Sequence, residues 1–263
     1  MQWGVLKKKF FSILLSPSCL TMSKTSLILI SGLIFCSTLA ANEDALVVVT
    51  RVAGDVLLER SGKSKRLKFN SILEEGDLII SKKGKADIQV GPGAIIRLQP
   101  NSKLVIKTAY RKGSVEKTSV KLNQGSLFTK IFNKMLGNSY FSVETPSAVA
   151  AVRGTEFLIS NGDAKDSDPN GIYVHSGEVA VTLQKGPKKR EFIATTNEQV
   201  LLNYEDAKKE ILDNYMKKKL EILSGVKLMR EKSYEMLKLQ RERSRKNLEK
   251  VRKMHKDNLE KIR

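Results

Sequence analysis

The stretch Thr145–Ile159, TPSAVAAVRGTEFLI, combines three backbone signals within fifteen residues. Pro146 holds the chain extended because its ring fixes φ. The alanines that follow have small side chains and permit close packing against a neighbouring segment. Gly154 permits a sharp reversal, and the apolar run after Glu156 is typical of a β-strand. This pattern predicts that the stretch is part of a tightly packed β-structure.

Arg153 is the charged residue of this stretch with two open interpretations. A planar guanidinium forms bidentate pairs with carboxylates, so a structural ion pair with Glu144 or Glu156 is one prediction. A contact with an anion or a protein partner is the other. The candidate binding residues of this motif, for which we expect a mainly structural role, are Thr145, Pro146, Arg153, Gly154, Thr155 and Glu156.

The sequence on both sides of this stretch is also typical of β-structure. Short apolar or alternating runs, bounded by Gly, Pro, Asn or Asp, fill the chain from Leu46 to Leu202. Among them, Ser114–Leu122 and Gly125–Ile131 are two separate predicted strands. We therefore predict an all-β domain over residues 44–203.

One local pattern recurs four times in this domain. A glycine, a polar residue and an aliphatic residue open an alternating run at Gly54, Gly76, Gly125 and Gly177. Glycine adopts the positive φ that a tight turn needs before a strand begins. The pattern predicts four strand-opening turns and carries no function of its own.

Residues 204–263 have a different composition. They contain no proline and a single glycine, and they are rich in Lys, Glu, Leu, Arg and Met, which favour helices. Two apolar stripes, Leu212–Leu223 and Leu248–Ile262, are separated by charged residues such as Arg230 and Arg241. A strong coiled coil would keep the seam apolar. We predict a long, solvated C-terminal helix that associates weakly with itself.

The charge of this tail indicates electrostatic contacts. The whole chain has a net charge of +19, and residues 204–263 hold 19 Lys and Arg against 11 Asp and Glu. A basic surface attracts anionic surfaces or acidic partners. The tail residues that we select as candidate contacts are Arg241, Arg245, Arg252 and Lys256. Any membrane contact is expected to be peripheral.

The N-terminal segment 1–40 predicts export. From Met22 the chain has a positive residue, Lys24, then an apolar run and the small-residue site Thr38-Leu39-Ala40. We expect Met22 to be the start, residues 1–21 to be an over-extended gene start, and cleavage to follow Ala40; a longer signal is the alternative. Lipoprotein processing at Cys36 is the less favoured alternative because the large Phe35 precedes it.

Several chemistries lack support in the sequence. Both cysteines precede residue 40, so the expected mature protein has neither disulfides nor cysteine-ligated zinc. Asp166–Gly171 resembles the opening of a calcium loop, but Gly177 occupies the position of the required Glu, which favours a turn. His175 and His255 have no carboxylates at metal-site spacing. We therefore predict no metal, no cofactor and no catalytic residues.

The motifs together resemble the FecR-like domain family. The resemblance covers about residues 47–203 and rests on Thr145–Ile159, on Glu74–Leu104 with its Gly-Asp and Pro-Asn-Ser segments, and on Val174–Val179. It implies a compact β fold of the jelly-roll or double-stranded β-helix kind in the bacterial envelope. In the best-known members, this domain is the periplasmic half of a regulator that senses a loaded outer-membrane iron transporter.

The best-known members also carry a cytoplasmic anti-sigma segment and a transmembrane helix before the domain. Here the expected signal peptide takes that place, so we expect a binding role, sensory or scaffold-like, without sigma-factor control. The expected partner is an envelope protein or a cell-wall component, and the expected location is the periplasm or cell envelope. The alternatives are an envelope hydrolase acting on polysaccharide and a peptidoglycan-binding structural protein. A nucleic-acid partner is not expected, because aromatics do not interleave with the basic residues.

Overall fold

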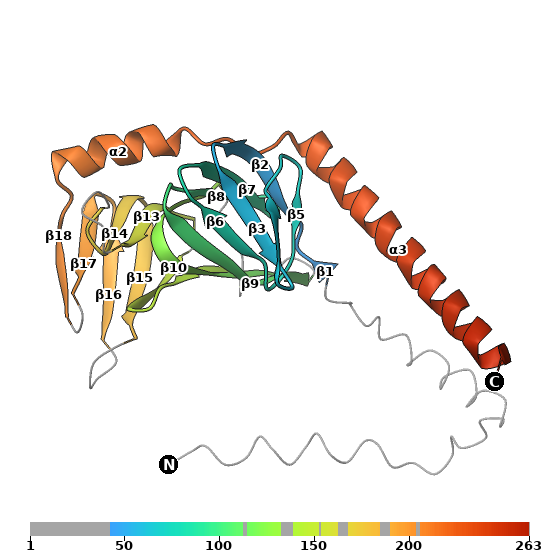
Figure 1. The fold of residues 1–263 in the computed structure, drawn as a ribbon. Coiled ribbons are helices and arrows are strands. Elements are labelled where there is room, and N and C mark those ends of the chain that lie inside the picture. Colours follow the sequence, from blue (N-terminus) through green and yellow to red (C-terminus); the bar gives the residue numbers. More distant parts are fainter. Residues whose placement is uncertain are drawn as a thin grey trace, which may run out of the picture. The chain divides into compact units, whose positions relative to one another are not determined.

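The fold is described from a computed structural model, which covers residues 43–112, 115–132, 139–152, 154–162, 168–184, 190–203 and 206–262. Within them the chain forms a β domain of two stacked sheets, followed by two helices (Figure 1). This confirms the prediction of an all-β fold followed by a long C-terminal helix.

The two sheets share one strand, β10 (Val115–Ile131), and each is open at both ends. Sheet A runs in the order β4 (Lys63–Arg66), β3 (Val56–Arg60), β6 (Leu78–Ser81), β9 (Ser102–Lys112), β10, β11 (Tyr140–Glu144), β12 (Ala148–Val152), β15 (Glu178–Leu183) and β16 (Glu191–Thr195). The short β1 (Glu43–Asp44) also pairs with β9. Sheet B runs in the order β5 (Ile72–Leu73), β2 (Val47–Ala53), β7 (Lys85–Val90), β8 (Ala94–Leu98), β10, β13 (Glu156–Asn161), β14 (Gly171–Ser176), β17 (Glu198–Leu202) and β18 (Ala207–Ile211).

Strand β10 passes from sheet A into sheet B at Gly125. Residues 115–124 pair with β9, and residues 125–131 pair with β8 and β13. Gly125 has a φ of 88°, and a Cβ there would lie 2.6 Å from the Asn101 carbonyl oxygen and even closer to Ser102 Oγ. The sequence predicted two strands here; the structure has one strand that bends where only glycine fits.

The predicted positive φ of the four recurring glycines is confirmed, and three of them open strands as predicted. Gly54, Gly76, Gly125 and Gly177 all have φ between 78° and 93°. Such values are costly for residues that carry a Cβ. The pattern therefore marks turns and, at Gly125, a bend within a strand.

The main core lies between the inner faces of the two sheets. Its members are aliphatic and aromatic residues at alternate strand positions, since successive side chains of a strand point to opposite faces. Examples that are fully buried are Val49, Ile88, Ile96, Leu104, Val120, Phe141, Phe157, Val174, Val181 and Val200.

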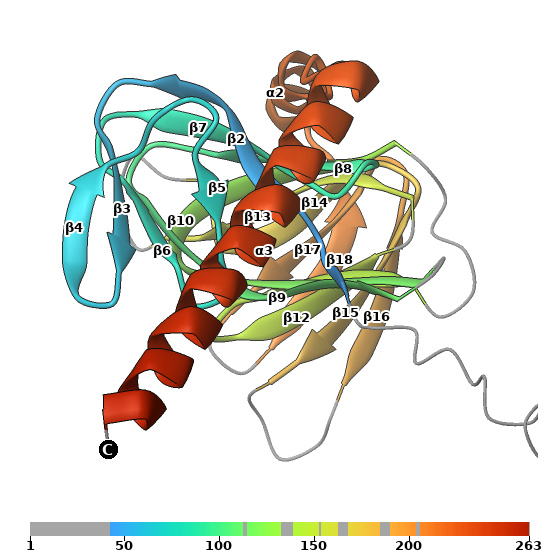
Figure 2. The same cartoon turned by 90° about the vertical axis from the view of Figure 1, so that its right-hand side faces the viewer.

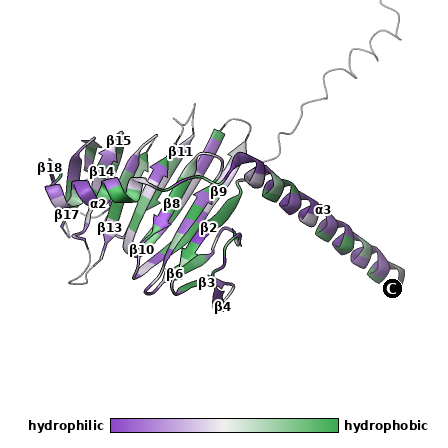
Figure 3. Cartoon of the chain, turned by 90° about the horizontal axis from the view of Figure 1, so that it is seen from above, coloured by the Kyte–Doolittle hydropathy of each residue, from purple (hydrophilic) through white to green (hydrophobic). Residues whose placement is uncertain are grey.

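A second apolar cluster lies on the outer face of sheet B, beneath α2 (Asn214–Ser224) (Figures 1 and 3). The sheet contributes Ile95, Phe128, Leu158 and Tyr173, all almost fully buried. The covering segment contributes Leu212, Met216, Leu220 and Leu223, whose three- and four-residue spacing places them on one helix face. Helix α2 thus belongs to the packed β domain.

Several polar contacts fix the ends of α2. Asp213 is the N-cap residue, and its carboxylate accepts a hydrogen bond of 2.7 Å from the Met216 amide. Near the other end, Lys130 Nζ donates to the Ser224 carbonyl oxygen at 2.9 Å. A cation at a helix C-terminus is favourable because the last carbonyl oxygens carry partial negative charge.

The expected domain boundary at residues 203/204 differs from the structure. The predicted helical tail begins instead with β18, which extends sheet B beside β17, and then α2 buries its apolar face. The sequence AKKEI of β18 has the charged composition of a helix, but lysine is also typical of exposed edge strands. The helix that extends away from the β domain is α3 (Glu231–Ile262).

Helix α3 contacts the β domain through its N-terminal part, from Tyr234 to Arg241. Tyr234 is buried against Leu46 and Val48, and Leu237 packs against the same cluster. The residues from Arg243 to Glu260 are exposed, and the C-terminal end of α3 lies clear of the strands (Figure 2). Hydrophilic residues predominate along α3, with hydrophobic ones interspersed (Figure 3). No helix among the described residues has both the length and the apolar character needed to cross a membrane.

Candidate functional site

The Thr145 motif makes a connection within sheet A and then crosses to sheet B. Thr145 is buried; its Oγ1 donates to the Ala148 carbonyl oxygen and accepts from the Ala148 amide, both at 3.0 Å. Pro146 is exposed at this turn. The alanine run forms β12, which pairs with β11 on one side and β15 on the other.

The reversal at Gly154 packs directly against a second sheet-to-sheet crossing at Gly177. Gly154 has a φ of 76°, and a Cβ on Gly177 would lie 2.9 Å from the Gly154 carbonyl oxygen. Thr155 is buried, and its Oγ1 donates to the Glu178 carbonyl oxygen at 2.9 Å. These contacts hold the two crossings together. Arg153 lies outside the described residues.

Both carboxylates that were considered as partners of Arg153 pair with lysines. Glu144 lies 3.3 Å from Lys107 Nζ and accepts a hydrogen bond from Ser119. Glu156 lies 3.0 Å from Lys130 Nζ, the same atom that binds the end of α2. The motif is thereby connected, through Lys130, to the helix on the outer face of sheet B.

The Asp166–Gly171 segment lies only partly in the described chain, because residues 163–167 are outside it. Asp168 is buried and its carboxylate pairs with Lys219 of α2 at 2.5 Å. Asn170 accepts a hydrogen bond from the Gly162 amide. Within the described residues, no three His, Cys, Asp or Glu side chains are grouped so that they could hold a metal ion.

A charged row on the outer face of sheet B was not selected from the sequence. Arg51 of β2 pairs in register with Asp87 of β7, and Asp87 pairs with Arg97 of β8. Arg97 Nε and Nη2 donate to the two Asp87 carboxylate oxygens at 2.6 and 2.7 Å. These hydrogen bonds raise the pKa of Arg97 further, so the guanidinium is charged at any physiological pH. Because the row is formed across three strands, spacing within one strand does not reveal it.

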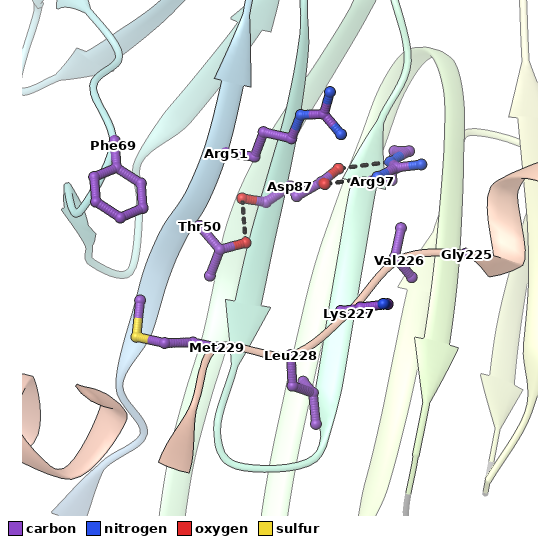
Figure 4. A pocket seen from close by; sticks show the side chains of 10 residues that line it. All are labelled: Thr50, Arg51, Phe69, Asp87, Arg97, Gly225, Val226, Lys227, Leu228 and Met229. Atoms are coloured by element: carbon purple, nitrogen blue, oxygen red, sulfur yellow. Dashed lines mark hydrogen bonds and ion pairs between the residues drawn. The ribbon is translucent and has the colours of Figure 1, made fainter. Parts of the chain in front are cut away.

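This row lies in a pocket of about 340 Å³ (Figure 4). The linker after α2, Gly225–Met229, crosses the same face and borders the pocket, held by a hydrogen bond of 2.8 Å from the Met229 amide to Gln89. Arg51 and Lys227 are exposed, and within the described chain neither has an acidic partner. Phe69, 62% exposed, adds an aromatic side chain to the lining.

A second buried arginine–aspartate pair supports the turn that contains Gly76. Arg60 Nε and Nη2 donate to the Asp77 carboxylate at 2.7 and 2.6 Å, and Arg60 also donates to the Ile72 carbonyl oxygen. Asp77 is 1% exposed and accepts a further bond from the Glu74 amide. All of these partners are local to the turn, which assigns the pair to the scaffold.

One known protein family matches the central part of this sequence. The family described as "FecR protein" matches residues 77–180, which run from the Gly76 turn through the Thr145 motif to β15. Residues 77–180 therefore carry the FecR domain.

Two solved structures have a more distant similarity to this chain. Two crystal structures of a candidate anti-sigma factor from Parabacteroides distasonis ATCC 8503 are similar at 17% identity with a TM-score of 0.41. In both, the alignment covers 51% of this chain and 58% of the other chain. No curated protein matches the sequence significantly.

The structure separates the four tail residues selected from the sequence. Arg241 and Arg245 line a groove of about 510 Å³ between α3 and the β-domain residues Glu74 and Glu75. Arg241 Nη1 donates to the Ala45 carbonyl oxygen at 3.3 Å. Arg252 and Lys256 lie on the exposed part of α3, where Lys256 is 3.9 Å from Glu260. The structure therefore brings only the first two close to the β domain.

Proposed function

We propose that this protein is an exported, non-enzymatic binding module of the bacterial cell envelope with a sensory or scaffold-like role. The observation that carries the proposal is the pocket of Figure 4, because it leaves a positively charged part of the outer face of sheet B accessible beside the matched FecR domain. A neighbouring part of that face is covered by α2. A preformed pocket with a few placed polar groups and apolar lining is suited to specific binding.

The exposed part of α3 is proposed as a second, electrostatic contact. From Arg243 to Glu260 it carries seven Lys and Arg and three Asp and Glu, which gives a net charge of +4. The basic residues surround the helix, so they favour a weak anionic contact over one flat membrane-binding face. Such contacts weaken with salt, because the screening length falls from ~10 Å at 0.1 M to ~3 Å at 1 M.

Sedimentation with isolated envelope fractions tests the two contacts together. We expect the mature protein to sediment with these fractions, and a chain ending at Arg230 to bind more weakly at low salt and equally at high salt. Equal binding of the two chains at low salt would contradict the role of α3. Binding to purified sacculi alone would favour a peptidoglycan-binding structural protein, and release of soluble sugars would favour the hydrolase alternative.

Export is tested at the native N-terminus. We expect the mature chain to begin at Ala41 without lipid, because the small-residue site ends at Ala40. Intact-mass and N-terminal peptide mass spectrometry of protein from the native cell measures this. An acylated Cys36, or a retained Met22, would contradict the expected processing.

A further inference from the structure

We propose that the pocket of Figure 4 binds an acidic side chain of a partner peptide, with an apolar neighbour of that residue against Phe69. This inference rests on the proposed binding function and adds the chemical class of the partner.

The charge balance of the pocket is positive. Three cations, Arg51, Arg97 and Lys227, share the pocket with a single carboxylate, that of Asp87. Both oxygens of that carboxylate are taken by the fork of Arg97, which leaves the charges of Arg51 and Lys227 uncompensated among the described residues. Uncompensated like charges repel one another, and an anion between them removes that repulsion.

Arg51 is placed to contact a ligand in the pocket. It lies beside Asp87 in strand register, and its guanidinium is exposed at the pocket (Figure 4). A guanidinium binds a carboxylate through two parallel hydrogen bonds. Lys227 lines the same pocket from the linker, so a strand and the linker each contribute an exposed cation to it.

Part of the pocket lining is apolar. Phe69, Val226, Leu228 and Met229 border the charged row, and Phe69 is largely exposed. A bare inorganic anion would leave the exposed Phe69 side chain uncovered, whereas an acidic residue beside an apolar residue would contact both the cations and Phe69. Aromatic and arginine side chains together are also typical of protein-binding surfaces.

Several contacts hold the lining of the pocket in place. Its floor is formed by three paired strands, β2, β7 and β8, and its linker wall is fixed by buried Val226 and by the bond between Met229 and Gln89. Thr50 Oγ1 also donates to the Asp87 carbonyl oxygen at 3.2 Å. The charged groups are thus largely positioned before a ligand arrives, which reduces the ordering cost of binding.

The probe is acetyl-Phe-Glu-Leu-amide, titrated into the ¹⁵N-labelled mature protein and followed by NMR shifts. We expect the amides of Thr50, Arg51, Phe69 and Lys227 to shift. The matched peptide acetyl-Phe-Gln-Leu-amide should bind at least fivefold more weakly. Equal binding of the two peptides, or shifts confined to other parts of the chain, would overturn the proposal.

Matched variants separate the pocket from general charge. Arg51→Gln should weaken binding of the Glu peptide at least fivefold, whereas Arg66→Gln, on exposed β4 outside the pocket, should change it less than twofold. Phe69→Ala should weaken it without changing the preference for Glu over Gln. Equal effects of Arg51→Gln and Arg66→Gln would overturn the assignment, as would inorganic phosphate binding as tightly as the Glu peptide. If the peptide fails while the protein still sediments with envelope fractions, the pocket assignment is wrong and the binding function stands.

Discussion

Leu220→Ala is expected to lower the free energy of unfolding by about 2–5 kcal/mol, the usual cost of truncating a buried leucine. Leu220 lies on the buried face of α2, is fully buried, and packs in the cluster that contains Phe128 and Tyr173. Its loss leaves a cavity on the outer face of sheet B. In a domain of this size, we expect the melting temperature to fall by roughly 5–15 °C, which thermal unfolding followed by circular dichroism measures.

Ile222 provides the matched control on the same helix. It is 77% exposed, so Ile222→Ala should change the stability by less than about 0.5 kcal/mol. The two substitutions remove similar amounts of apolar side chain from neighbouring positions of α2. If both variants unfold like the parent protein, α2 does not belong to the cooperative β domain, and the original boundary at residue 203 would be the correct one.

Gly125→Ala is expected to be more damaging than an alanine at any open turn. The substitution places a methyl group within 2.6 Å of backbone atoms of Asn101 and Ser102 and imposes a positive φ on alanine. The conformation alone costs about 1–2 kcal/mol. The contact with backbone adds to this because backbone atoms of two paired strands cannot move independently. We expect a total loss of at least about 3 kcal/mol or a failure to fold.

Gly76→Ala separates the conformational cost of a positive φ from the cost of the steric contact. Gly76 has nearly the same φ, 85°, but nothing lies within 4 Å of its Cβ position. It should therefore lose only the conformational cost of about 1–2 kcal/mol. Urea unfolding of both variants gives the comparison, and an insoluble Gly125→Ala counts only if Gly76→Ala folds normally. Equal losses would show that the crossing of β10 is not tightly packed at Gly125.

The turn chemistry of this fold could be predicted from the sequence, but the strand pairing could not. The positive φ of the four recurring glycines follows from glycine alone, so one sequence was sufficient. The partners of each half of β10 depend on contacts with β8, β9, β11 and β13. Local sequence carries no record of these distant neighbours. It therefore predicted two strands where one continuous strand changes sheets.

The outer face of sheet B shows the same limit for the site. The apolar stripe Leu212–Leu223 was visible in the sequence, but its burial depends on Ile95, Phe128, Leu158 and Tyr173, which are distant along the chain. Likewise Arg51, Asp87 and Arg97 form a charged row only through the register of three strands. The motif residues Thr145 and Thr155 were found because they are close together in sequence. Residues that act across strands were missed.

Strand β10 also affects how the domain folds and unfolds. Because one continuous strand supplies a central member of each sheet, neither sheet can be completed or dismantled without the other. Its neighbours include β8 and β13, which precede and follow it in the chain, so long segments must be ordered before it is paired on both sides. Loop-closure entropy opposes such non-local pairing, and folds of this kind cross their folding barrier slowly. Slow pairing keeps strand edges exposed for longer, and the β domain then folds as one cooperative unit.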